Sequence, residues 1–346
     1  DDHTTAARLA LGLWDSLPDR VLLKAVEQGK LKTRAQIMGQ ARRMARDPRA
    51  RIKMREFFHQ WLKMDEAEDL AKDAKLFPRF DDRIVSDLRT SLDLFIEDIL
   101  WSEASDYRQI LLANEMFVNR SLAKFYGIDE PGQKGFKKVS LDPKERTGVV
   151  THPYLLTTFA YADSTSPIHR GVFITRNMLG RTLKPPPVAV SFDEQEFKPD
   201  LTMREKVTEL TKSRACQNCH SIINPLGFSL EHYDAVGRFR TREDDGGRPI
   251  NASSEYQTDE GETIRLTGAR DLAEYAANSA SAQRGFVIQL FNHIVKQPVQ
   301  AYGGDALSAL RGSFAKSGCD MRELVIEIAV MSSQHREPTS KETAAK

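Results

Sequence analysis

The sequence contains few cysteines, and this scarcity limits the scaffolds that it can build. Only Cys216, Cys219 and Cys319 occur among 346 residues, whereas small secreted domains held by disulfides devote a far larger share of their residues to cysteine. Two thiols that are three residues apart suit a shared cofactor, and Cys319 then has no partner for an intramolecular disulfide. We therefore exclude a disulfide framework.

Charge imbalance and long apolar runs are also missing. Fifty basic against 49 acidic side chains leave a formal net charge of +1, so no global field attracts nucleic acid or an anionic membrane. No apolar stretch approaches the ~20 residues that cross a bilayer, and we expect no transmembrane segment. Neither a phosphate-binding loop nor a hydrolase constellation is recognisable. The composition, 40% hydrophobic and 29% charged, is that of an ordinary soluble protein.

What the sequence does contain is one C-x-x-C-H motif, formed by Cys216, Cys219 and His220. This spacing is the attachment signature of a c-type haem. The two thiols add to the two vinyl groups of the porphyrin, and the adjacent imidazole coordinates the iron. The motif therefore predicts one covalent haem c, with His220 as the proximal ligand.

Zinc and a redox-active dithiol are the alternative uses of the two thiols. His232 has the spacing of a zinc finger's first histidine, but Val236, Gly237 and Arg238 occupy the positions where a second histidine would stand. The remaining thiol, Cys319, is 100 residues beyond the motif. A redox-active dithiol usually opens a helix after a strand in a βαβ pattern, and no such pattern surrounds the motif. Haem remains the leading interpretation.

The sixth ligand of the iron separates an electron carrier from a catalyst, because an open or labile position binds peroxide and other small molecules. His293 lies on the apolar face of the helix predicted around Phe286 and is the expected distal ligand. A buried histidine more often bonds a carbonyl, however, so alternatives stay open. They are Met331, Met321, His169, water or no ligand.

Residues that follow the motif are expected to surround the porphyrin. Arg238 and Arg240 suit the haem propionates, because a guanidinium matches carboxylate geometry, although surface ion pairs are the alternative. A dry apolar wall is expected from Pro225, Leu226, Phe228, Leu230 and Tyr233. His152 and His169 are expected at solvated surface, with the mouth of a site as the alternative, and His59 and His232 carry only weak claims.

Apolar residues at helical spacing predict a mainly α fold. Thr33 and Gln36 are placed to form a capping box, and a helix that includes Phe117 is expected to end at Gly127. Ser166 is placed to cap a helix that has a proline in its first turn. The helix that carries the thiols is expected to give way to a turn at 225–227.

We expect four parts along the chain, which are a multi-helix N-terminal domain (1–130), a helical cytochrome c-like domain with the haem site (140–250), a C-terminal helical domain (251–336) and a frayed tail (337–346). Short alternating runs near 250–256 and 263–266 predict a small β-hairpin insertion.

On these motifs the chain resembles the planctomycete and verrucomicrobial multidomain c-type cytochromes, exported proteins in which several domains of unknown function surround one C-x-x-C-H. The segment 117–127 looks like the family's first helical domain. The segments 165–171 and 224–231, with the triple proline at 185–187, look like its central domain, and 285–302 looks like its short C-terminal domain. The resemblance implies haem c on the motif and an extracytoplasmic location, but no particular reaction.

The leading hypothesis is a periplasmic or cell-surface monohaem cytochrome that passes electrons to a redox partner protein or another cytochrome domain. The alternative is a haem c oxidoreductase or peroxidase-like enzyme in polysaccharide metabolism, with an open or labile sixth position. A third class, a docking module, would use the haem-free first half. Because the chain opens with Asp1, Asp2 and His3 rather than an apolar leader, we expect an export signal to have been removed.

Overall fold

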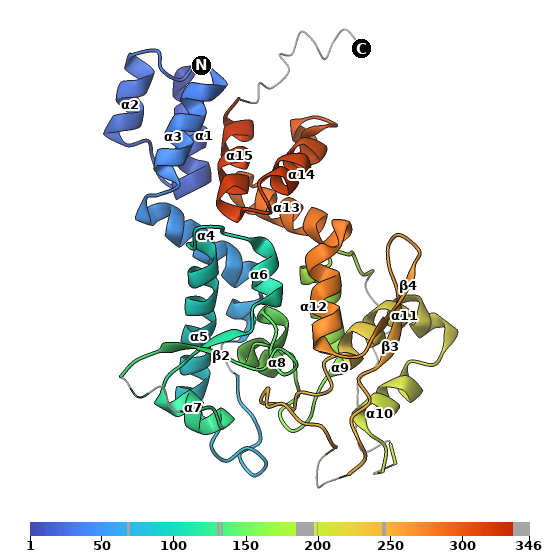
Figure 1. The fold of residues 1–346 in the computed structure, drawn as a ribbon. Coiled ribbons are helices and arrows are strands. Elements are labelled where there is room, and N and C mark those ends of the chain that lie inside the picture. The colour runs from blue at the N-terminus through green and yellow to red at the C-terminus, as the bar shows by residue number, and fades with distance from the viewer. Residues whose placement is uncertain are drawn as a thin grey trace. The chain divides into compact units, whose positions relative to one another are not determined.

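The computed structural model is mainly α-helical with two small antiparallel hairpins (Figure 1), which confirms the predicted fold class. It describes residues 1–67, 70–129, 132, 134–184, 197–198, 200–243 and 247–334. The predicted polyproline segment at 185–187 and the predicted tail at 337–346 lie outside the described residues.

The chain divides into two compact units. Unit 1 consists of Asp1–His59, Glu103–Asp106 and Val287–Lys346, and unit 2 consists of Gln60–Ser102 and Tyr107–Phe286. Helices α4 (Pro48–Trp61) and α13 (Ala280–Val295) carry the chain across the boundaries. These units are a grouping in space, and the division along the chain into 1–130, 140–250 and 251–336 stays a prediction.

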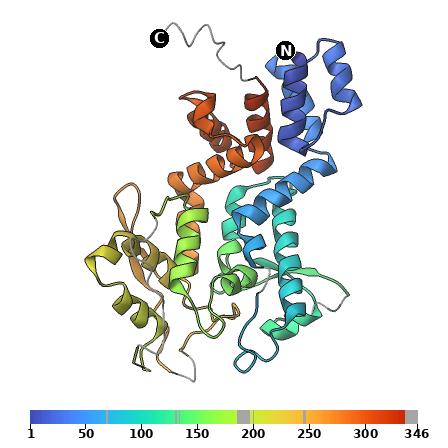
Figure 2. The same cartoon turned by 180° about the vertical axis from the view of Figure 1, so that it is seen from behind.

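Unit 1 brings both ends of the sequence into one helical cluster. Besides parts of α4 and α13, its elements are α1 (Asp2–Trp14), α2 (Arg20–Glu27), α3 (Arg34–Met44), the 3₁₀ turn η6 (Val299–Tyr302), α14 (Ala306–Lys316) and α15 (Met321–Gln334). The first and last helices, α1 and α15, lie side by side (Figures 1 and 2). At the start of α3, Thr33 and Gln36 form the predicted capping box.

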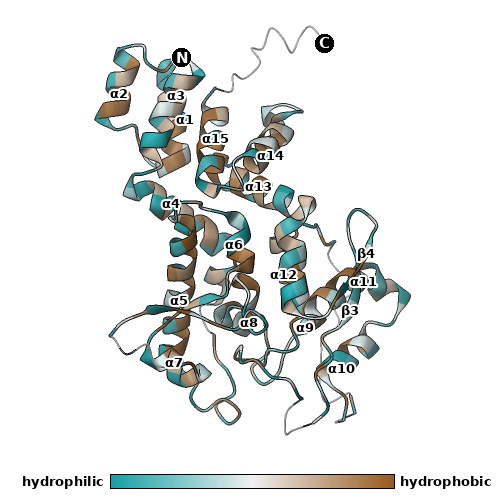
Figure 3. Ribbon diagram, viewed as in Figure 1, coloured by the Kyte–Doolittle hydropathy of each residue, from teal (hydrophilic) through white to brown (hydrophobic). Residues whose placement is uncertain are grey.

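Unit 2 carries both hairpins. Its elements are η1 (Met64–Ala67), α5 (Asp82–Leu100), α6 (Tyr107–Leu112), β1 (Glu115–Val118), α7 (Arg120–Tyr126), β2 (Lys137–Ser140), η2 (Val149–Thr151), α8 (Pro153–Thr158), α9 (Pro167–Phe173), the π turn η3 (Ile174–Met178), α10 (Met203–Leu210), α11 (Arg214–Phe228), β3 (Ser254–Gln257), β4 (Thr263–Leu266) and α12 (Ala269–Asn278). Apolar residues line the length of α5 (Figure 3), and Leu88, Leu92 and Phe95 of this helix are buried. The predicted hairpin is β3–β4. Ser166 caps α9 as expected.

The helix predicted through Phe117 was wrong at its start. Phe117 belongs to β1, whose residues Met116 and Val118 are buried in alternation with more exposed neighbours. The α-helix begins only after Asn119, whose side chain accepts a hydrogen bond from the backbone N–H of Leu122. A strong N-cap therefore separates a short strand from the helix, and the expected helix end at Gly127 is confirmed.

The turn predicted at 225–227 was also wrong, because α11 continues through Pro225 to Phe228. Its last turns pack closely against α9. A Cβ added to Gly227 would lie 1.9 Å from the carbonyl oxygen of Pro167, and one added to Gly171 would lie 2.2 Å from that of Ile223. The glycines are therefore needed where the two helices cross.

Replacing Gly227 with alanine is expected to lower the free energy of unfolding by about 1–3 kcal/mol, because the added methyl group forces α9 and α11 apart. The matched control is Gly39→Ala on α3, where nothing lies within 4 Å of an added Cβ; this change should stabilise by about 1 kcal/mol. Urea unfolding followed by circular dichroism measures both. A Gly227→Ala protein as stable as the wild type would contradict the close crossing.

Candidate functional site

The C-x-x-C-H motif lies inside one helix. α11 starts at Arg214, and the Ser213 side chain accepts a hydrogen bond from the backbone N–H of Cys216 at 3.3 Å. Cys216, Cys219 and His220 stand at positions i, i+3 and i+4, which share one helix face. Both cysteines are free and half-buried, and His220 is half-buried as well. The helix therefore presents two thiols and an imidazole together.

A chain of hydrogen bonds fixes the imidazole of His220. Its Nδ1 lies 2.9 Å from Oδ1 of Asn224, one turn later on α11. The Asn224 Nδ2 donates to Oγ1 of Thr211 at 2.9 Å, and this hydroxyl donates to the carbonyl oxygen of Val207 at 2.8 Å. The Gln217 side chain also donates to the Thr211 carbonyl oxygen, at 2.6 Å. The motif is thereby attached to the end of α10.

The donors and acceptors in this series of hydrogen bonds determine which nitrogen of His220 carries the proton. The single hydroxyl hydrogen of Thr211 is used on Val207, so Thr211 accepts from the amide nitrogen of Asn224. The amide oxygen must then face His220 and accept from its Nδ1–H. In the neutral imidazole this leaves the lone pair on Nε2, the arrangement that a metal-ligating histidine needs.

These residues fit a covalently attached haem c. Two free thiols would form the thioether bonds, and the Nε2 lone pair of His220 would ligate the iron. Zinc fits less well, because no group of three or more His, Cys, Asp or Glu side chains is arranged to hold a metal ion in the part of the chain that the structure describes. A haem supplies its own four ring nitrogens and needs only these three attachment points.

The apolar residues expected around the porphyrin pack within unit 2. Leu226 is fully buried, and Phe228 forms a cluster with Met203 and Val207 of α10. The guanidinium of Arg204 covers the Phe228 ring at 4.2 Å. Of the other members of the expected wall, Leu230 and Tyr233 are buried and Pro225 is half-buried. Their contact with a haem stays a prediction.

Arg238 and Arg240 have protein groups as partners. The Arg238 guanidinium lies 4.3 Å from the centre of the Phe125 ring. Arg240 lies 3.4 Å from the carboxylate of Glu243. The Arg240–Glu243 pair corresponds to the ion-pair alternative that the sequence left open, whereas Arg238 contacts an aromatic ring; the binding of propionates stays a prediction for both.

His293 lies in unit 1, whereas the motif lies in unit 2. It is 6% exposed, and its Nε2 is 3.2 Å from the carbonyl oxygen of Lys53, which links α13 to α4. Its ring meets Phe57 edge-on. Burial, reinforced by Lys296 and Lys53, lowers its pKa to about 4. Its role as the sixth ligand stays a prediction, as do those of the alternatives Met321 and Met331, which also belong to unit 1.

A buried arginine, which the sequence analysis missed, holds the segment that follows α11. Arg170 on α9 is 1% exposed, and burial lowers its pKa to about 10. Its terminal nitrogens donate to four backbone carbonyls, which are those of Leu230 (3.0 Å), Tyr233 (2.8 Å), Asp234 (2.8 Å) and Leu156 (3.2 Å). The buried carboxylate of Glu231 lies 4.0 Å away.

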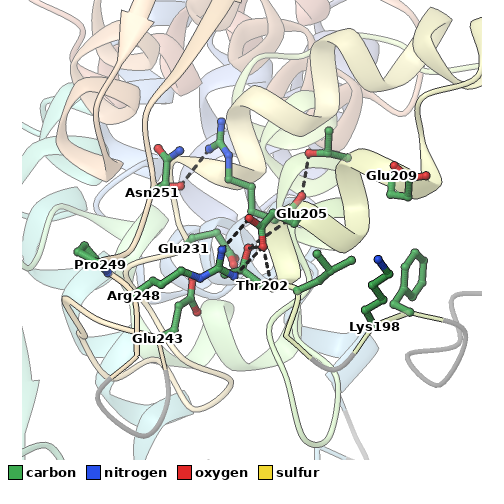
Figure 4. A pocket seen from close by; sticks show the side chains of 13 residues that line it. Lys198, Thr202, Glu205, Glu209, Glu231, Glu243, Arg248, Pro249 and Asn251 are labelled. Atoms are coloured by element: carbon green, nitrogen blue, oxygen red, sulfur yellow. Dashed lines mark hydrogen bonds and ion pairs between the residues drawn. The ribbon is translucent and has the colours of Figure 1, made fainter.

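A cavity of about 820 Å³ lies beside α10 (Figure 4). Arg248 reaches the carboxylate of Glu205 with two hydrogen bonds, and this pairing lowers the pKa of Glu205 to about 2. Thr202 and the buried Glu231 also line the cavity, but the thiols and the imidazole of the motif do not. The cavity is thus a separate feature from the motif.

The expectation that His152 lies at solvated surface was wrong. His152 is 4% exposed, and its Nδ1 accepts from the backbone N–H of Tyr154 at the start of α8. Its Nε2 must then carry the proton, and it lies 3.2 Å from Oγ of Ser91. Burial, with a contribution from Arg146, lowers the pKa of His152 to about 3. This histidine is a helix cap and a neutral hydrogen-bond donor.

Acidification is expected to destabilise the protein through His152. Between its unfolded pKa of about 6.5 and its folded pKa of about 3, only the unfolded state binds the proton. The contribution of neutral His152 to the free energy of unfolding is therefore fully present above about pH 6.5. Below this pH the free energy of unfolding falls by up to ~1.4 kcal/mol per pH unit. Thermal unfolding from pH 7 to 4 should show a shallower loss in His152→Asn, which keeps a capping side chain. The exposed control His3→Asn should follow the wild type, and parallel wild-type and His152→Asn curves would contradict this assignment.

Two families match the chain. Residues 1–128 match a family described as PSD4, protein of unknown function (DUF1592), and residues 146–243 match one described as PSCyt3, protein of unknown function (DUF1588). No curated protein and no solved structure matches the chain. The second match contains the C-x-x-C-H motif, Asn224 and Arg170. The two matched domain families are typical of planctomycete-type cytochrome c-like proteins, to which these parts of the chain are similar.

Proposed function

We propose that the protein is a monohaem c-type cytochrome that transfers electrons, with haem attached to Cys216 and Cys219 and ligated by His220. The observation that carries this proposal is the 2.9 Å contact between His220 Nδ1 and Asn224 Oδ1, which leaves Nε2 for a metal on the same helix face as two free thiols. When bound, the haem supplies one-electron cycling of its iron. The protein's own residues hold and orient the ligand.

We place the protein outside the cytoplasm, since this is where haem attachment to C-x-x-C-H generally occurs. Among the described helices, none combines the length and apolarity required to cross a bilayer. Its partner in this proposal is a redox protein or another cytochrome domain. The half-buried motif, with exposed neighbours Ser213, Arg214 and Gln217, leaves this end of α11 open to such a partner.

An optical spectrum tests electron transfer against catalysis. The full chain, produced with a haem-attachment system, is expected to contain one covalent haem with a low-spin, six-coordinate ferric spectrum. After reduction it should not react with carbon monoxide, because a saturated iron has no free position. Rapid binding of carbon monoxide or peroxide would overturn the carrier proposal.

A second candidate function is a haem c oxidoreductase or peroxidase-like enzyme with an open or labile sixth position. His293 Nε2 lies 3.2 Å from the Lys53 carbonyl oxygen, so only the Nδ1 side of this ring is left for a metal, and its role as the distal ligand stays a prediction. Replacing His293 with alanine, together with the wild-type spectrum, discriminates between the two candidates. A spectrum unchanged by this replacement removes His293 as a ligand, whereas a shift from low to high spin supports His293 as the distal ligand; a high-spin or labile iron already in the wild type supports the enzyme.

A further inference from the structure

We infer that Asn224 and Thr211 form a positioning relay that sets the electron-donor strength of His220. The inference rests on the proposed haem attachment and concerns how the protein adjusts that site. The relay is the hydrogen-bonded series from His220 Nδ1 through the Asn224 amide and the Thr211 hydroxyl to the carbonyl of Val207.

Every bond of the relay points in the same direction. The imidazole donates to the amide, the amide donates to the hydroxyl, and the hydroxyl donates to the carbonyl. Hydrogen bonds in such a series polarise one another, so each one strengthens the acceptor before it. Thr211 is 2% exposed and Asn224 is 7% exposed, so water competes little for these groups. The Asn224 oxygen is therefore a stronger acceptor than an isolated amide.

The acceptor at Nδ1 acts on the opposite nitrogen of the ring. A stronger acceptor draws the Nδ1 proton away and increases the electron density on Nε2, which raises ligand basicity. A more basic ligand stabilises ferric over ferrous iron and lowers the reduction potential. The relay is anchored on α10 rather than on α11 alone, and the Gln217–Thr211 bond holds the same anchor from within the motif.

The reduction potential separates this positioning role from a merely structural one. We expect Asn224→Ala to raise the potential and shift the ferric-to-ferrous equilibrium by about tenfold, which corresponds to about 59 mV for one electron. Asn224→Asp, nearly isosteric but charged, should lower the potential. Thr211→Val should raise it by less than Asn224→Ala, and Thr211→Ser, which keeps the hydroxyl, should restore the wild-type value.

Thr208→Val is the matched control. Thr208 is on the same helix and, like Thr211, donates its hydroxyl hydrogen to a carbonyl four residues earlier, that of Arg204. It takes no part in the relay. A loss of helix stability alone would affect Thr208→Val and Thr211→Val similarly, whereas only the second should change the potential.

Redox titration of the haem-loaded full chain measures the potentials, and nitrogen-15 NMR of the full chain produced without haem measures the tautomer of His220. The relay predicts the Nδ1–H tautomer in the wild type and a mixture in Asn224→Ala. Equal potentials in all loaded variants would overturn the inference and leave the cytochrome proposal intact. A wild type that takes up no covalent haem would overturn the cytochrome proposal itself, and the NMR result would then decide only whether the relay orients His220.

Discussion

Replacing Cys216 and Cys219 together with serine is expected to abolish covalent haem attachment. In the proposed cytochrome each thiol would form one thioether bond to a vinyl group of the porphyrin, and a serine hydroxyl is a much weaker nucleophile than a thiolate. Haem staining of a denaturing gel measures the covalent haem directly, and the pyridine haemochrome spectrum counts the thioether bonds. We expect no stained band for the double variant and about one haem per chain for the wild type.

The single variants and a third cysteine provide the controls. Cys216→Ser and Cys219→Ser should each retain at most one thioether, which shifts the haemochrome band. Cys319→Ser should stain like the wild type, because Cys319 lies buried in unit 1, away from the motif in sequence. A doubly substituted chain that still holds haem on a denaturing gel would refute the assignment of the attachment site.

Replacing Arg170 with methionine is expected to cause the largest loss of stability of any substitution proposed, about 3–5 kcal/mol. The change removes one donor from each of four backbone carbonyls, of which those of Leu230 and Asp234 keep a backbone N–H donor; each lost hydrogen bond to a charged group costs about 1.5–3 kcal/mol at most. It also removes the Arg170 guanidinium that lies 4.0 Å from the buried carboxylate of Glu231. The four carbonyls belong to α8 and to the segment after α11, so these parts should separate first.

Urea unfolding of Arg170→Met against Arg176→Met measures this effect. Arg176 follows on the same helical stretch but is exposed, so its replacement should change stability by less than about 0.5 kcal/mol. Arg170→Lys is a further test, because one ammonium cannot reproduce a planar fork of donors. Similar stabilities for the two methionine variants would show that the carbonyls find other donors.

Local signals in the sequence predicted the starts and ends of helices well where a single capping residue determines them. The capping box of Thr33 and Gln36, the Ser166 cap and the end at Gly127 act within one turn of the chain. The strand at Phe117 could not be seen in this way, because its pairing partner β2 lies about 20 residues later and carries a weak, polar alternation. Pairing across that distance, rather than local preference, determines the strand.

The reactive groups of the site could be predicted from the sequence, but the residues that hold them in place could not. The C-x-x-C-H spacing names both thiols and the imidazole, and Asn224 stands at i+4 from His220, a pair that any helix brings together. Because a turn was predicted at 225–227, the pair was not recognised as two residues of one continuous helix. Thr211 and Arg170 act between helices, so the sequence alone offered no signal for them.

The pairing of α1 with α15 has a consequence for the order in which the protein folds. The Thr5 hydroxyl donates to the carbonyl oxygen of Ser333, so α1 can pack against α15 only after α15 has been synthesised. All residues of unit 2, including the C-x-x-C-H motif, are synthesised earlier. Contacts between distant parts of a chain form slowly, and a truncation after α13 should leave unit 2 folded while the apolar face of α1 remains exposed to chaperones and proteases.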